Sequence, residues 1–130
     1  MGLEERRKIK EYQDTIVPER SAELAEICGT AIPYDIDWDS FANDAEALRF
    51  LDNLSFHRIN MAMRVICTDE LGREAIKDSL KVIKLKNVAD KAEMKINFGG
   101  GALEMALNYA KGTEGYYSDG EIRTVLMTGL

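Results

Sequence analysis

The sequence has few cysteines, one histidine and no long apolar run, and each shortage excludes a class of protein. Cys28 and Cys67 are too few for a framework of several disulfides, and both end apolar helical patterns, which favours reduced, buried thiols. The single histidine, His57, leaves a Cys–His catalytic pair with one candidate base and no evident residue to orient it. No apolar run approaches the roughly 18 residues that cross a bilayer, so we expect no membrane partner.

Basic residues are fewer than acidic residues. Asp and Glu number 23 against 17 Lys and Arg, which gives a formal net charge of −6. Nucleic-acid binding needs a basic surface to neutralise phosphates, so no nucleic-acid partner is expected. The first ten residues are charged and lack the apolar segment of a secretion signal, which favours a cytoplasmic protein.

What is present fits one globular domain. The chain has 130 residues, of which 45% are hydrophobic and 31% charged. A chain of this length and composition buries an ordinary core without disulfides or metals. We therefore predict a single domain over residues 1–130.

Helical periodicity dominates the N-terminal half of the chain. Apolar residues recur near a 3.6-residue spacing from Ile9 to Ile27, and Gly29 is a suitable stop signal. Asn43 and Glu46 have the spacing of a capping box, with Asn43 as the N-cap of a second helix. A further helix is predicted after Thr68. Its predicted inner face consists of Leu71, Ala75 and Leu80.

Period-two alternation predicts strands in the remaining segments. A short edge strand is expected at about residues 32–38, and three more strands between about 81 and 110. Because the connections among those three are short, we predict a three-stranded antiparallel meander. A second capping box, at Ser118 to Glu121, predicts a C-terminal helix at about 119–129. The expected fold is α+β with a helix-rich N-terminal half.

The most specific local pattern is an acidic stretch that resembles a calcium-binding EF-hand loop. Its ligand positions would be Asp35, Asp37, Asp39, the backbone carbonyl of Phe41, Asn43 and Glu46. The stretch departs from the EF-hand pattern at Ser40, where the sharp turn needs glycine, and strand-like alternation replaces the entering helix.

A simpler interpretation explains the same acidic residues. The aspartates would form the solvent-facing side of an edge strand, and Asn43 with Glu46 would cap a helix. The two arrangements exclude each other, because a strand spreads its aspartates over steps of roughly 6–7 Å. A calcium loop must bring them within about 2.5 Å of one ion.

The charges are unevenly distributed along the chain. No Lys or Arg lies between Arg20 and Arg49, whereas six lysines lie between Lys77 and Lys95 inclusive. Either the two regions neutralise each other within the fold or remain solvated, or the acidic region binds a basic partner or a second copy of the chain.

No complete catalytic or cofactor motif is present in the sequence, so an enzyme is not favoured. The hypothesis that fits best is a small acidic, non-enzymatic interaction or regulatory protein that binds a protein partner or itself. The predicted contact residues are Asp35, Asp37, Trp38, Asp39 and Phe41, with the two aromatic residues as apolar anchors. The alternatives are a calcium-binding module at residues 35–46 and a small enzyme that pairs His57 with a carboxylate.

Overall fold

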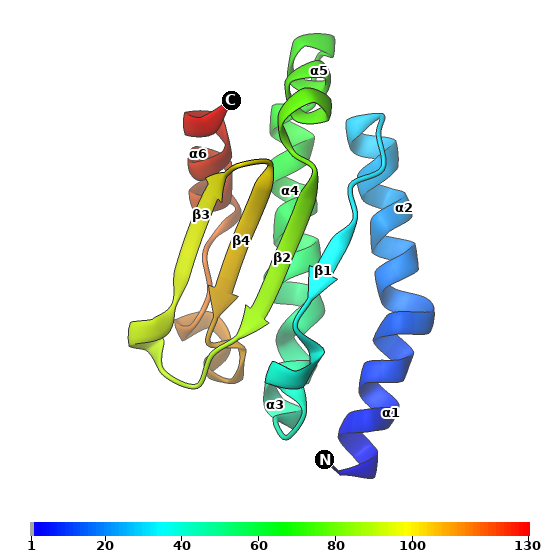
Figure 1. Ribbon diagram of the computed structural model, residues 1–130, viewed down its shortest axis with the longest axis vertical. Helices are drawn as coiled ribbons and strands as arrows, with labels where there is room; N and C mark the ends of the chain where they lie inside the picture. Colours follow the sequence, from blue (N-terminus) through cyan, green and yellow to red (C-terminus); the bar gives the residue numbers. More distant parts are fainter. Residues whose placement is uncertain (1) are drawn as a thin grey trace.

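The computed structural model describes residues 2–130, which fold into a layer of helices packed on a four-stranded sheet (Figure 1). The helices are α1 (Leu3–Glu11), α2 (Val17–Cys28), α3 (Ala45–Leu51), α4 (His57–Ile66), α5 (Glu70–Ser79) and α6 (Asp119–Gly129). The strands are β1 (Tyr34–Ile36), β2 (Val82–Asn87), β3 (Lys95–Gly99) and β4 (Ala102–Leu107). The α+β class and the helix-rich N-terminal half are as the sequence predicts.

Two long helical rods form most of the helical layer. A π-helical segment, Tyr12–Ile16, joins α1 to α2, and another, Asp52–Phe56, joins α3 to α4. The rods pack against each other where α1 meets α3 and where α2 meets α4. Between these contacts the Tyr12 hydroxyl donates to the backbone carbonyl of Leu48 in α3, and the Tyr12 ring centroid lies 6.4 Å from that of Phe56. The first rod ends at Gly29, whose φ of 71° is the left-handed conformation that glycine adopts readily.

The strand order is β1-β2-β4-β3, so the predicted antiparallel meander is wrong. Strands β1, β2 and β4 are mutually parallel, and only β3 is antiparallel to its neighbour β4. The chain leaves β2, passes to the outer edge as β3 and returns through a glycine turn as the central strand β4. Burial explains the order, because Leu103, Met105, Ala106 and Leu107 of β4 are all buried, whereas β3 is exposed at alternate residues.

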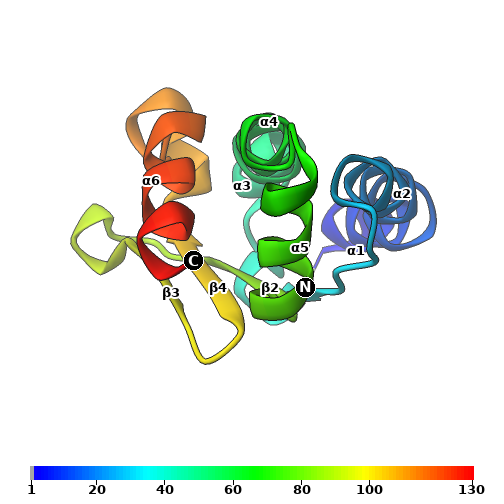
Figure 2. The same cartoon turned by 90° about the horizontal axis from the view of Figure 1, so that it is seen from above.

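The two faces of the sheet differ sharply. Helices α2, α4 and α6 lie side by side along one face (Figure 2), where Ile83 and Leu85 of β2 enter the core. The opposite face carries a row of polar side chains in register across the four strands. From β1 to β3 the row consists of Asp35, Lys84, Glu104 and Asn97. The early acidic and later basic regions of the chain therefore lie next to each other in the sheet.

The C-terminal helix forms where the sequence predicts it. The side chains of Ser118 and Glu121 each accept a hydrogen bond from the other residue's backbone N–H, at 3.1 and 3.2 Å respectively, which is a complete capping box. Ile122 and Leu126 are fully buried where α6 packs on α4 and β3. Within residues 2–130, none of the helices combines the length and apolar character that crossing a membrane requires.

Candidate partner-binding groove

The acidic stretch forms the end of β1 followed by a 3-10 helix, Trp38–Phe41. Asp35 is exposed on β1, opposite Lys84 of β2. The Asp37 carboxylate accepts a hydrogen bond from the Ser40 backbone N–H at 3.3 Å and so caps the 3-10 helix. Only Asp35 therefore lies on the strand, as the edge-strand interpretation expects, whereas Asp37 and Asp39 belong to the 3-10 helix and its cap.

Phe41 is a core residue rather than a surface anchor. It is fully buried, and its ring centroid lies 5.3 Å from that of Tyr109 and 6.3 Å from that of Trp38. The structure thus places Phe41, a predicted contact residue, in the core and away from the surface. Trp38 is half-buried, and Asp39 beside it is exposed.

The helix after the acidic stretch begins one residue later than predicted. Asp44, not Asn43, is the N-cap of α3, because its Oδ1 accepts from the Ala47 backbone N–H at 3.0 Å. Its second oxygen, Oδ2, accepts from Nδ2 of Asn87 at 3.2 Å and so links α3 to the end of β2. Capping-box spacing alone cannot reveal this second, tertiary contact.

Replacing Asp44 with alanine should therefore lower the free energy of unfolding by about 1–2 kcal/mol, because it removes the cap and leaves the Asn87 amide short of a partner. Urea denaturation measures the change. Asn43→Ala is the matched control, and we expect it to change the unfolding free energy by less than about 0.5 kcal/mol, since Asn43 is exposed and caps nothing. Equal losses in both variants would contradict the assignment of the cap.

The proposed calcium ligands are dispersed in the structure. Glu46 lies 3.9 Å from Arg49 on the surface of α3, whereas Asp35 belongs to the open face of the sheet. Across residues 2–130, the structure contains no group of three or more His, Cys, Asp or Glu side chains placed to hold a metal ion. The geometry therefore gives the EF-hand hypothesis no support.

His57 has no catalytic partner in the described structure. It is half-buried at the start of α4 and takes part in none of the ion pairs found within residues 2–130. The enzyme hypothesis required a carboxylate within hydrogen-bonding reach of this imidazole. Of the sequence-predicted residues, Asp35 and Asp37 line one small hollow of about 240 Å³ on the open face of the sheet, where the other charged lining residues are Lys84, Lys86, Lys95 and Glu104. His57 is not part of it.

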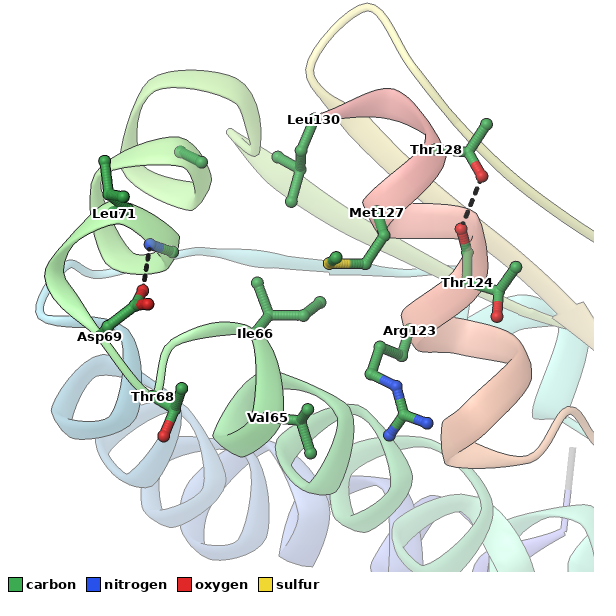
Figure 3. Close-up of a pocket in the computed structure, with 12 residues that line it drawn as sticks. Val65, Ile66, Thr68, Asp69, Leu71, Arg123, Thr124, Met127, Thr128 and Leu130 are labelled. Carbon is green, nitrogen blue, oxygen red and sulfur yellow. Dashed lines mark hydrogen bonds between the residues drawn. The ribbon is translucent and has the colours of Figure 1, made fainter.

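A different feature emerges at the end of the helical layer, in a groove between α5 and α6 (Figure 3). Its volume is about 840 Å³, and the last turn of α4 forms its floor. The groove residues are Val65, Ile66, Thr68, Asp69, Leu71, Gly72, Ala75, Arg123, Thr124, Met127, Thr128 and Leu130. We call this surface the α5–α6 groove.

The large apolar side chains exposed to solvent are concentrated in the α5–α6 groove. Within residues 2–130 there are five such residues, and four of them line the groove: Val65 (52% exposed), Leu71 (78%), Met127 (59%) and Leu130 (40%). The fifth, Leu3, lies on α1 and outside the groove. Scattered apolar residues are ordinary on a protein surface, but their convergence in one hollow is typical of an interaction site.

The groove exists because α5 turns away from α4 at a tight junction. The Asp69 carboxylate caps α5 by accepting from the Gly72 backbone N–H at 2.9 Å. Gly72 lies so close to the end of α4 that a Cβ at this position would overlap the carbonyl oxygen of Ile66. Helix α5 then packs against α2, whereas α6 packs on α4 and β3, and this divergence leaves the space between α5 and α6 unfilled.

Arg123 is the distinctive charge of the groove. Asp69, the other charged residue of the lining, is engaged at the N-terminus of α5. The hydroxyls of Thr124 and Thr128 donate to backbone carbonyls of their own helix, at 2.9 and 2.8 Å. Arg123 forms none of the ion pairs found within residues 2–130. The groove thus offers apolar surface beside one cation without a carboxylate partner.

The predicted inner face of α5 is wrong for Leu71, which is the most exposed of the large apolar residues, whereas Leu80 is buried as predicted and Ile76 is buried with it. The signal in the sequence is that the segment carries apolar residues in two directions, Leu71 with Ala75 and Ile76 with Leu80, the residue that follows α5. A single core covers one apolar face of a helix, so the second apolar face stays exposed.

The two cysteines lie directly behind the groove. Their Sγ atoms are 3.3 Å apart at the ends of α2 and α4, and both residues are buried free thiols. The hydrogen bond between the two thiols lowers the pKa of the Cys67 thiol and raises that of Cys28, and burial raises the pKa of Cys28 further. Arg73 of α5 donates to the Cys67 backbone carbonyl at 3.2 Å, so this junction joins three helices.

We expect the oxidant diamide to join Cys28 to Cys67, because two thiols in contact need only a small displacement to bond. Each thiol loses its hydrogen, the two sulfurs bond, and both hydrogens pass to diamide. Mass spectrometry should show a loss of two hydrogens and no titratable thiol in the denatured protein. In the control variant Cys28→Ser, Cys67 should form no intramolecular bond. Two titratable thiols in the treated wild type would contradict the contact.

A half-buried ion-pair network connects α2 to the rod formed by α3 and α4. Arg20 binds both carboxylate oxygens of Asp52, at 2.8 and 3.1 Å, and also Glu23 at 3.2 Å. Asn60 donates to Glu23 at 2.6 Å, and this hydrogen bond is the largest cause of the lowered pKa of Glu23. Since the charges pair within the fold, the network holds the helices together rather than presenting a site.

No family model, no curated protein and no solved structure matches this chain.

Proposed function

We propose that this chain is a non-enzymatic interaction domain that binds a protein partner through the α5–α6 groove. The observation that carries the proposal is the convergence of Val65, Leu71, Met127 and Leu130, exposed by 40–78%, in one hollow. Burying such side chains against a partner releases about 25 cal/mol per Å² of apolar surface, which is the dominant favourable term in most protein associations.

The groove supports a protein partner better than a small ligand. Small-molecule sites enclose most of the ligand surface and place several polar groups around it. This groove is open to solvent, and its lining offers Arg123 and the capping carboxylate of Asp69 beside apolar and backbone-engaged groups. An apolar lining with few charged residues, here Arg123 and Asp69, is instead the anatomy of a protein interface.

The test compares a groove variant with a matched surface variant. Leu71→Asp places a charge in the groove, whereas Leu3→Asp places the same charge on α1, at a residue 54% exposed. Proteins captured from the source cells by wild type and by Leu3→Asp, but not by Leu71→Asp, are identified and purified. Isothermal titration of one such partner should then show binding to wild type that weakens at least tenfold in Leu71→Asp and is unchanged in Leu3→Asp.

Circular dichroism of all three proteins establishes that the variants remain folded. A purified partner that binds Leu71→Asp as tightly as wild type would place its contact outside the groove. The proposal would be wrong if Leu71→Asp captured every protein that wild type captures.

A further inference from the structure

We propose that the occupant of the α5–α6 groove is an amphipathic helix of a different protein, with a carboxylate that pairs with Arg123. This inference rests on the proposed function and names the chemistry of the partner. Its evidence is the shape of the groove walls, the concavity of the surface and the state of its charges.

The walls of the groove favour a helical occupant. One wall is helix α5, with Leu71 and Ala75 four residues apart, and the other is α6. Arg123, Met127 and Leu130 follow i, i+4, i+7 spacing and form a ridge along α6 beside the hollow (Figure 3). Ridges of this kind interdigitate with the side chains of another helix. A helix also satisfies its own backbone groups, whereas an extended peptide would desolvate unpaired N–H and C=O groups against apolar walls.

Concavity argues against a second copy docked groove to groove. In a two-fold dimer the same patch faces itself, so two hollows of about 840 Å³ would meet and leave unfilled space between them. Interface cores are packed as densely as protein interiors, and such a void forfeits that packing. A convex apolar helix fills the hollow instead.

Charge complementarity supplies the second requirement on the occupant. Arg123 lines the groove on α6 and has no carboxylate partner within residues 2–130. Asp69 caps α5 through Oδ1 and forms no ion pair with Arg123. A partner carboxylate beside the apolar stripe would form a charge-assisted, partly desolvated ion pair, and an ammonium there would be repelled.

The experiment selects binders without assuming their conformation. Random peptides of about 20 residues, long enough to form a stable helix, are displayed on phage and selected on wild type with Leu71→Asp as the counter-target. We expect the enriched peptides to carry apolar residues at i, i+3 or i+4, and i+7 with a flanking Asp or Glu. Circular dichroism should show that they become helical when bound.

A charge reversal then tests the pairing with Arg123. Arg123→Glu should weaken the selected peptide at least tenfold, and changing the peptide's flanking carboxylate to lysine should restore binding to Arg123→Glu but not to wild type. Restoration separates pairing from a structural defect in the variant. The inference would be wrong if the Arg123→Glu variant bound the original peptide as tightly as wild type does.

The remaining outcomes separate the inference from the proposed function. The proposal of a helical occupant is wrong if the selected peptides bind in an extended conformation. It is also wrong if the selection yields no peptide whose binding depends on the groove. Light scattering that shows a wild-type dimer and a Leu71→Asp monomer identifies a second copy as the occupant and also overturns it. In each case the capture and titration of a natural partner still decide whether the groove binds protein.

Discussion

Replacing Phe41 with alanine should lower the free energy of unfolding by about 3–5 kcal/mol, the range for truncating a buried aromatic residue. Phe41 is fully buried between the rings of Tyr109 and Trp38, so the variant loses apolar burial and leaves a cavity that the surrounding aromatic residues cannot close. Urea denaturation followed by circular dichroism measures the loss. Binding to a partner should be unaffected wherever the variant remains folded.

Trp38→Ala is the matched control, because Trp38 neighbours Phe41 in the same 3-10 helix but is half-buried. We expect it to cost less than Phe41→Ala, since Trp38 is partly exposed and its truncation opens a site that water can enter rather than a closed cavity. A Phe41→Ala protein of unchanged stability that no longer binds its partner would reinstate Phe41 as a surface anchor.

The substitution Gly72→Ala should also be strongly destabilising, at about 3 kcal/mol, because the added methyl group meets backbone rather than a movable side chain. The Cβ would overlap the carbonyl oxygen of Ile66, and relief requires α5 to move away from the end of α4. Since Gly72 and Ile66 both line the α5–α6 groove, partner binding should weaken along with stability.

Gly120→Ala is the control for Gly72→Ala, since both glycines lie in the first turn of a helix. A Cβ at Gly120 would meet no atom closer than the Ser118 Oγ at 3.7 Å, which is ordinary contact. Alanine there should stabilise the protein by up to about 1 kcal/mol, because it lowers the entropy of the unfolded chain. A similar gain for Gly72→Ala would show that α4 and α5 are not tightly joined.

The elements that local patterns specify were predictable from the sequence. The helix at Asp119–Gly129 follows from the capping box at Ser118 and from apolar residues at helical spacing, both of which are contained in a short segment. The strand at Tyr34–Ile36 likewise follows from its alternation. The position of β4 between β2 and β3 was not predictable, because it depends on which strand buries more surface, a property of the assembled sheet.

The candidate site was the least predictable part. The acidic and aromatic residues of segment 35–46 suggest a binding site. In the structure Asp37 and Asp44 are helix caps and Phe41 is a core residue. The groove residues Val65, Leu71 and Met127 look like core residues in sequence, because a pattern records that a residue is apolar but not whether another element covers it. Their exposure follows only from the divergence of α5 and α6.

Hydrogen–deuterium exchange of the partner complex locates the binding surface without a substitution. We expect slower exchange on binding in segments 65–75 and 123–130, which contain the α5–α6 groove, and no change in segment 34–42. Protection confined to segment 34–42, with the groove segments unchanged, would show that the partner binds the acidic stretch and not the groove.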